Sequence, residues 1–140
     1  MKNLSAQIEL EVAFYDLDPM DIVWHGNYVK YFELARCALL EKINYSYSQM
    51  TESGYSWPVI DFRVRYIKPA KLGQKLLCTA KIVDYENRLK IAYELHCSKT
   101  GERLTKAHSV QVAVDMAKKE MQLVSPKVLH DRIGTALEKP

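Results

Sequence analysis

The sequence predicts an α+β fold in which one long amphipathic helix packs against one antiparallel sheet. The first observation is a period-two pattern over 7–15, in which large apolar residues recur at every second position, as is typical of a strand. The second is a segment, 27–44, in which apolar residues recur every three or four positions, as they do on one face of a helix. The third is a series of four or five further alternating segments, which indicates a meander of strands.

The elements follow one another with short turns between them. The expected strands, which share the period-two pattern, cover 7–15, 57–66, 75–85, 88–98 and 104–115, with a short edge strand near Gln122. The expected helices, which follow capping or proline signals, cover 27–44, 46–53 and 126–137. Asn27 is the expected N-cap of the long helix. These segments leave no room for a repeat or a linker.

Composition indicates one globular domain spanning residues 1–140. Hydrophobic residues make up 48% of the chain and charged residues 26%, which excludes a disordered protein. The formal net charge is +3 and the basic residues are dispersed, so we expect no nucleic-acid partner. The three cysteines form no CxxC pair, which argues against a disulfide framework or a zinc site.

The sequence also predicts a cytoplasmic protein. Glu9 and Glu11 fall where a signal peptide needs its apolar stretch. No uncharged run approaches the roughly 18 residues of a membrane span. A single sheet on one helix leaves its strand edges open, so we expect an oligomer that covers them.

The segment between the first strand and the long helix carries the chemistry. It contains three carboxylates, Asp16, Asp18 and Asp21, followed by His25. The first amides of a helix lack partners within the helix and can polarise a carbonyl oxygen. A carboxylate that acts as base or nucleophile, placed beside such amides, supplies the two parts that acyl transfer needs. Gly26 would let a ligand approach the backbone closely.

Other readings of the same residues stay open from spacing alone. Asp18 and His25 are as compatible with structural as with catalytic roles, and Asp16 is better explained as a turn cap. The chain lacks the Gly-x-Ser-x-Gly elbow of serine hydrolases. Its acidic residues, histidines and cysteines do not fall at metal-ligand spacings, so we expect no metal site.

Residues 16–36 (DLDPMDIVWHGNYVKYFELAR) resemble the signature of the 4-hydroxybenzoyl-CoA thioesterase family, and most closely its YbgC-type acyl-CoA thioesterase branch. Residues 62–76 resemble the strand, turn and strand that follow the helix in that family. The likeness covers roughly residues 9–114. Met20 and Asp21 depart from the pattern, since many relatives have a small residue and then glycine, and this departure bears on the choice of substrate.

The resemblance implies a hotdog fold, with the central helix wrapped by a curved antiparallel sheet of five or six strands, assembled as a homodimer or homotetramer. It implies hydrolysis of an acyl-CoA, or of an acyl group on acyl carrier protein, without any cofactor. Asp18 would be the catalytic nucleophile or general base, and His25 would support the thioester carbonyl. The residues expected to bind substrate, with the basic ones near the CoA phosphates, are Tyr15, Gly26, Asn27, Arg63, Arg65 and Lys68.

Two other functions remain open for this fold. The first is a protein that binds acyl-CoA or acyl carrier protein without hydrolysing it. The second is a hotdog dehydratase, whose central helix usually carries a catalytic histidine. The expected helix here contains Glu33 and Glu41 but no histidine, which places the dehydratase last.

Overall fold

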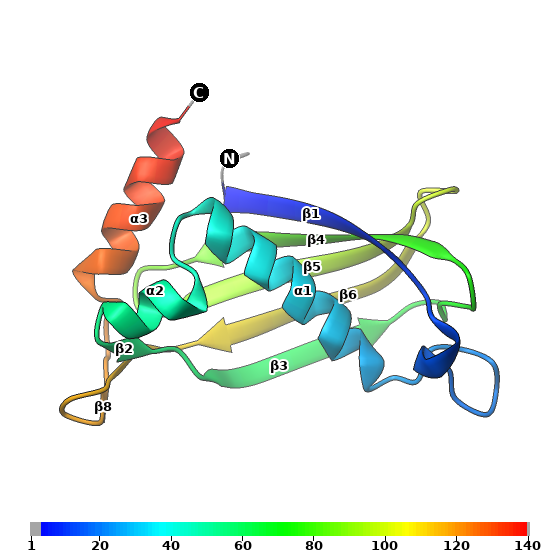
Figure 1. Cartoon of the computed structure of the whole chain (residues 1–140), viewed down its shortest axis with the longest axis horizontal. Coiled ribbons are helices and arrows are strands. Elements are labelled where there is room, and N and C mark those ends of the chain that lie inside the picture. Colours follow the sequence, from blue (N-terminus) through cyan, green and yellow to red (C-terminus); the bar gives the residue numbers. More distant parts are fainter. Residues whose placement is uncertain (1–3, 140) are drawn as a thin grey trace.

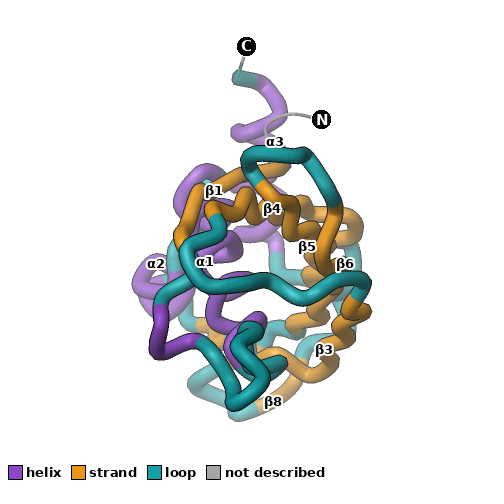
Figure 2. Tube along the Cα trace, turned by 90° about the vertical axis from the view of Figure 1, so that its right-hand side faces the viewer, coloured by secondary structure: helices purple, strands orange, loops and turns teal. Residues whose placement is uncertain are grey.

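The computed structural model describes residues 4–139, in which an antiparallel sheet curves around the long helix α1 (Asn27–Lys42) (Figure 1). Figure 2, seen from the side, shows the strands in an arc with α1 inside it. The predicted α+β architecture, with one helix wrapped by five antiparallel strands, is therefore confirmed. Residues 1–3 and 140 of the expected 1–140 domain lie outside the described part.

Each strand and helix expected from the sequence has a counterpart in the structure. Five strands form the main sheet: β1 (Ser5–Glu11), β3 (Val59–Tyr66), β4 (Lys75–Asp84), β5 (Leu89–Cys97) and β6 (Arg103–Gln111). Three two-residue strands form a second sheet: β2 (Tyr55–Ser56), β7 (Val114–Asp115) and β8 (Glu120–Met121). The remaining elements are helical: the 3-10 turn η2 (Phe14–Asp16), α2 (Tyr47–Glu52) and α3 (Lys127–Glu138).

The order of strands in the sheet is β1-β4-β5-β6-β3. The predicted meander is therefore right only for β4 to β6. Because β1 pairs with β4 from Ser5–Lys81 to Glu11–Lys75, the edge of β4 is not available to β3. Strand β3 pairs instead with β6, from Val59–Gln111 to Tyr66–Thr105, and forms the opposite edge.

Some element boundaries differ from the expected ones for local reasons. The first strand ends at Glu11 because residues 14–16 turn into a 3-10 helix. Helix α1 ends at Lys42 because Asn44 adopts a left-handed conformation, with φ of 58°. The expected strand 104–115 is divided into β6 and β7.

The core lies between α1 and the inner face of the sheet. Tyr28, Tyr31 and Phe32 are all buried, as their helical spacing predicts. The rings of Phe32 and Tyr93 lie 5.1 Å apart, and Phe62 of β3 stacks on Tyr93 at 6.0 Å. Aromatic contacts therefore join α1 to the middle and the edge of the sheet.

A buried arginine lies between α1 and the sheet. Arg36 of α1 is 3% exposed and forms an ion pair with Glu33. Its guanidinium also donates hydrogen bonds to the hydroxyls of Tyr47, at 2.8 Å, and Tyr93, at 3.3 Å. Because a buried charge is tolerated only when it is paired and hydrogen-bonded, these partners explain how an arginine can face the sheet.

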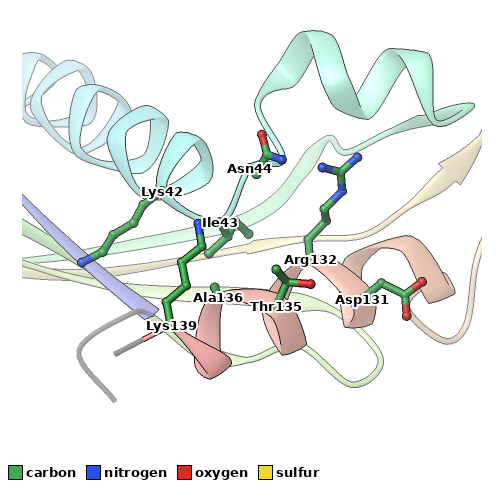
Figure 3. A pocket seen from close by; sticks show the side chains of 8 residues that line it. All are labelled: Lys42, Ile43, Asn44, Asp131, Arg132, Thr135, Ala136 and Lys139. Carbon is green, nitrogen blue, oxygen red and sulfur yellow. The ribbon is translucent and has the colours of Figure 1, made fainter.

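Helix α3 closes the end of the sheet near the C-terminal end of α1 (Figure 1). Its residues Leu129, Ile133 and Ala136 are buried in the core. A hollow of about 240 Å³ lies between α3 and the residues at the end of α1. Figure 3 shows the side chains that line it, most of which are polar.

Leu39 and Leu34 of α1 provide a matched test of this packing, since Leu39 is fully buried and Leu34 is 51% exposed. We expect Leu39→Ala to lower the free energy of unfolding by about 2–5 kcal/mol, because it leaves a cavity in the core. Leu34→Ala should change it by no more than about 0.5 kcal/mol. Urea unfolding of both variants checks this, and equal losses would contradict the described orientation of α1.

Candidate active site

The loop between η2 and α1 folds back on itself as a short hairpin. Leu17 and Val23 form an antiparallel bridge. The amide of Asp18 donates to the carbonyl of Ile22 at 2.8 Å, and the amide of Asp21 donates to the carbonyl of Asp18 at 3.1 Å. Asp21 adopts a φ of 63° at the tip, a conformation that aspartate tolerates better than most residues. The hairpin therefore fixes the backbone on both sides of Asp18.

Asp16 anchors this hairpin to the helix. Its side chain is buried, and its carboxylate accepts hydrogen bonds from the Ala13 amide at 3.1 Å and the Tyr31 hydroxyl at 2.8 Å. It also pairs with Lys30 Nζ at 2.5 Å. The backbone carbonyl of Asp16 accepts from the Trp24 amide at 2.9 Å. One residue thus holds the end of β1, the hairpin and the first turns of α1 together.

These contacts decide the charge of the Asp16 carboxyl. Burial by itself would raise the pKa of this group, but the hydrogen bonds from Lys30, Tyr31 and Ala13 outweigh burial, and the pKa is lowered from its ordinary value of 3.8. The Tyr31 hydroxyl shows the reciprocal effect, because burial and its bond to Asp16 raise its pKa. Asp16 is therefore a buried carboxylate that stays ionised and stabilises the local structure. This agrees with its interpretation from sequence as a residue that caps the turn.

Asp18 has a different environment. Its side chain is half-buried, and Oδ1 accepts a hydrogen bond from the Met20 amide at 2.8 Å. Among the described residues no hydrogen bond is made to Oδ2. Asp18 lines a hollow of about 300 Å³ together with His25 and Lys68. The other walls of this hollow are mainly apolar or aromatic: Met20, Ile22, Val23, Tyr28, Tyr66, Ile67 and Pro69.

The start of α1 lies next to this hollow. Within residues 4–139, the amides of His25 and Gly26 donate to no backbone acceptor, whereas the Asn27 amide donates to the carbonyl of Trp24 at 2.9 Å. Asn27 is the first residue of the helix and Gly26 occupies the N-cap position, so the prediction that Asn27 caps the helix is wrong. The Asn27 side chain donates instead to the Asp16 carbonyl at 2.8 Å.

A side chain at position 26 would meet the ring of Trp24. A Cβ atom at position 26 would lie 2.3–2.8 Å from three ring atoms of the Trp24 indole, which is well inside van der Waals contact. The φ of Gly26 is −68°, so backbone conformation does not explain the glycine. The absence of a side chain lets the Trp24 ring pack over the peptide at the helix start.

The structure brings some of the predicted site residues together and separates others. Asp18, His25 and Lys68 share one hollow, and Lys68 also pairs with Glu102 at 2.6 Å. Tyr15 is 77% exposed, with Lys30 Nζ 5.7 Å from its ring centre.

Arg63 and Arg65 line a different hollow, of about 420 Å³, on the face of the sheet that points away from α1. Lys90 and Lys106 line the same hollow. Within one chain, the two arginines are therefore separated from Asp18, and their role in substrate binding stays a prediction.

Sequence reasoning missed Tyr66, which is a wall of the Asp18 hollow and donates a hydrogen bond to the His25 carbonyl at 3.0 Å. The signal was available in the strand pattern. Successive residues of a strand point to opposite faces, so Tyr66 and Arg65 cannot both face α1. Selecting residues by charge pointed to the outer face of β3 and passed over Tyr66 on its inner face.

Membrane-spanning helices and clusters of metal-binding side chains are both absent from the described residues. No helix within residues 4–139 is long and apolar enough to cross a membrane. Across the same residues, no three His, Cys, Asp or Glu side chains gather in a way that would hold a metal ion.

Comparison with known proteins shows which family this chain resembles. Residues 12–131 match the model of the thioesterase-like superfamily. YneP of Bacillus subtilis, provisionally named an acyl-CoA thioesterase, is 36% identical over 108 residues, which are 76% of this chain and 78% of YneP. The acyl-CoA thioester hydrolase YbgC of Escherichia coli is 28% identical over 94 residues, which are 57% of this chain and 70% of YbgC.

Solved structures support the same conclusion about the fold. The DHNA-CoA thioesterase of Staphylococcus aureus superposes with a TM-score of 0.83 at 24% identity, over 95% of this chain and 91% of that one. This likeness, together with the family match, confirms the hotdog fold expected from the sequence.

The anchoring role of Asp16 can be tested with Asp16→Asn, which keeps the shape of the side chain and removes its charge. We expect the free energy of unfolding at pH 7 to fall by roughly 1–3 kcal/mol, because Lys30, Tyr31 and Ala13 lose a charged acceptor. The matched control is Asp131→Asn, which breaks the exposed Lys127–Asp131 pair of 3.9 Å on α3 and should have almost no effect.

The difference in stability between wild type and Asp16→Asn should depend on pH. Because the pKa of Asp16 is lowered in the folded state, its stabilisation is present above the ordinary carboxyl pKa and is lost as the pH falls through the folded-state pKa. The difference between wild type and Asp16→Asn should therefore shrink in acid. Denaturant unfolding across this pH range measures it, and a constant difference would contradict the role of the charge.

Proposed function

This chain belongs to the thioesterase-like superfamily, and on that premise we propose that it hydrolyses the thioester bond of an acyl-CoA, releasing a free acid and CoA. Its relatives YneP and YbgC carry names that assign them this chemistry. The enzyme class is therefore thioester hydrolase, and the proposal concerns which residues do the work and which substrate they act on.

One observation carries the proposal. Asp18, whose Oδ2 accepts no hydrogen bond from the described residues, lines the same hollow as His25. The amide of His25, like that of the neighbouring Gly26, donates to no backbone acceptor within residues 4–139. Asp18 either attacks the thioester carbon or removes a proton from the water that attacks it. The amides of His25 and Gly26 stabilise the negative charge that develops on the carbonyl oxygen. In the net reaction water adds to the carbonyl carbon, the C–S bond breaks, and the sulfur leaves as the CoA thiol.

The apolar walls of the hollow suit the acyl side of the substrate, since ligand sites are mostly apolar with a few polar groups that fix orientation. Lys68 at the rim is the basic residue best placed to meet the phosphates of CoA, and Arg63 and Arg65 are the weaker candidates. The same site would serve an acyl group carried by acyl carrier protein. We place this activity in a cytoplasmic homodimer or homotetramer built from one domain per chain, residues 1–140.

A second candidate function is binding of acyl-CoA or acyl carrier protein without hydrolysis. The hydrogen bond from the Met20 amide to Asp18 Oδ1 favours it, because half of this carboxylate already serves the hairpin. The two functions differ in one measurable respect. A binding protein holds acyl-CoA without releasing free thiol.

The decisive variant is Asp18→Asn. The amide oxygen can still accept from Met20, so the hairpin and the melting temperature should be retained. The loss of the base or nucleophile should lower kcat by on the order of 10²–10⁴-fold. Release of free thiol from a panel of short, medium-chain and aromatic acyl-CoA substrates measures this effect.

Asp21→Asn is the matched control on the same hairpin. Asp21 is exposed and its side chain accepts no hydrogen bond from another described residue, so turnover should match that of wild type. If Asp18→Asn is as active as this control on every substrate that wild type hydrolyses, Asp18 is not catalytic. If wild type binds acyl-CoA and releases no thiol from any of them, the second function is correct.

A further inference from the structure

Tyr66 reaches the candidate site from a part of the chain that is distant in sequence. It is the last residue of β3, on the edge of the sheet, and pairs with Thr105 of β6. Its hydroxyl donates a hydrogen bond to the backbone carbonyl of His25 at 3.0 Å. This is a contact between the sheet and the loop that leads into α1.

The Tyr66 ring is held in a defined position. It lies edge-on to the ring of Tyr28, with centres 5.1 Å apart and an angle of 76° between the planes. Tyr28 is itself buried, and its hydroxyl accepts a hydrogen bond from the Ala70 amide at 3.1 Å. Burial raises the pKa of Tyr66, so its hydroxyl keeps its proton and remains a donor at neutral pH.

The carbonyl that Tyr66 holds belongs to the same peptide group as the amide of Gly26. A peptide group is planar, and its C=O and N–H point in opposite directions. A hydrogen bond that fixes the His25 carbonyl therefore also fixes the direction of the Gly26 N–H. Among the described residues, that N–H donates to no backbone acceptor. A hydrogen bond at one end of a peptide also polarises the group and strengthens the donor at the other end.

We propose that Tyr66 is a positioning residue for thioester hydrolysis, whose hydroxyl fixes the His25–Gly26 peptide and with it the amides at the start of α1 that meet the carbonyl oxygen of the substrate. This inference rests on the proposed function. Tyr66 transfers no proton and forms no bond with the substrate. It acts through the His25–Gly26 peptide, so its contribution appears in the transition state, when charge develops on the oxygen, more than in binding of the ground state.

The test is Tyr66→Phe, which removes the hydroxyl and keeps the ring against Tyr28. We expect kcat for thiol release to fall roughly tenfold, the change expected from one hydrogen bond. KM should stay within about twofold, and the shape of the pH–rate profile and the melting temperature should not change. Tyr85→Phe is the control, because it removes a hydroxyl from the turn between β4 and β5, where Tyr85 packs against His130.

A second measurement reports on the peptide directly. The chain has five glycines, so protein labelled with ¹⁵N-glycine gives one amide signal for each. In Tyr66→Phe the Gly26 signal should move and the other four should not. This readout needs no substrate, and it separates loss of one contact from a general change of structure, in which several signals would move.

The outcomes separate this inference from the proposed function on which it rests. A lower kcat at unchanged KM with a shift of the Gly26 signal alone supports it. Unchanged kinetics in an active protein overturn it, as does a loss confined to KM, which would mean that the Tyr66 hydroxyl contributes to substrate binding and not to the transition state. A lower kcat accompanied by a lower melting temperature and general shifts overturns it in favour of a structural role. If wild type hydrolyses no acyl-CoA at all, the proposed function itself has failed.

Discussion

A single buried anion, the carboxylate of Asp16, determines how the strand, the loop and the helix meet. Its partners come from before the loop, at Ala13, and from the second turn of the helix, at Lys30 and Tyr31. Without them the hairpin that carries Asp18 would be held mainly by the segment after β3, where Val23 donates to the Ala70 carbonyl at 2.9 Å and Ile22 forms a bridge with Lys71. The first aspartate of the Asp-x-Asp pair is thus structural, and this leaves the second one free to face the hollow.

The strand order of the sheet completes the site. Because β3 lies at the edge beside β6, its last residue arrives next to the start of α1, and the groups around the hollow come from the loop, the helix and the sheet. In a simple meander β3 would lie beside β4 and not at the edge beside β6. The crossover from β3 to β4 therefore has a chemical consequence as well as a topological one.

Local features of the fold were predictable from sequence, whereas long-range pairings were not. Alternation over 75–98 located β4 and β5 almost to the residue, since it reflects which face each side chain takes. Alternation does not state which strands become neighbours, so the place of β3 was missed. The site loop was found because its carboxylates are adjacent in sequence, but the separation of Arg63 from Asp18 depends on the face of a strand and on the curvature of the sheet.

The packing of the Trp24 indole over Gly26 restricts which residues these two positions can hold at the same time. Any side chain at position 26 must displace the ring, whose outer atoms would lie 2.3–2.8 Å from the new Cβ. A lineage that loses the glycine must therefore first, or at the same time, shrink or re-orient the tryptophan, whereas position 24 can take a smaller residue while the glycine stays. The ring also lies 5.1 Å from that of His25, so re-orienting the tryptophan would also remove a contact with a residue of the candidate site.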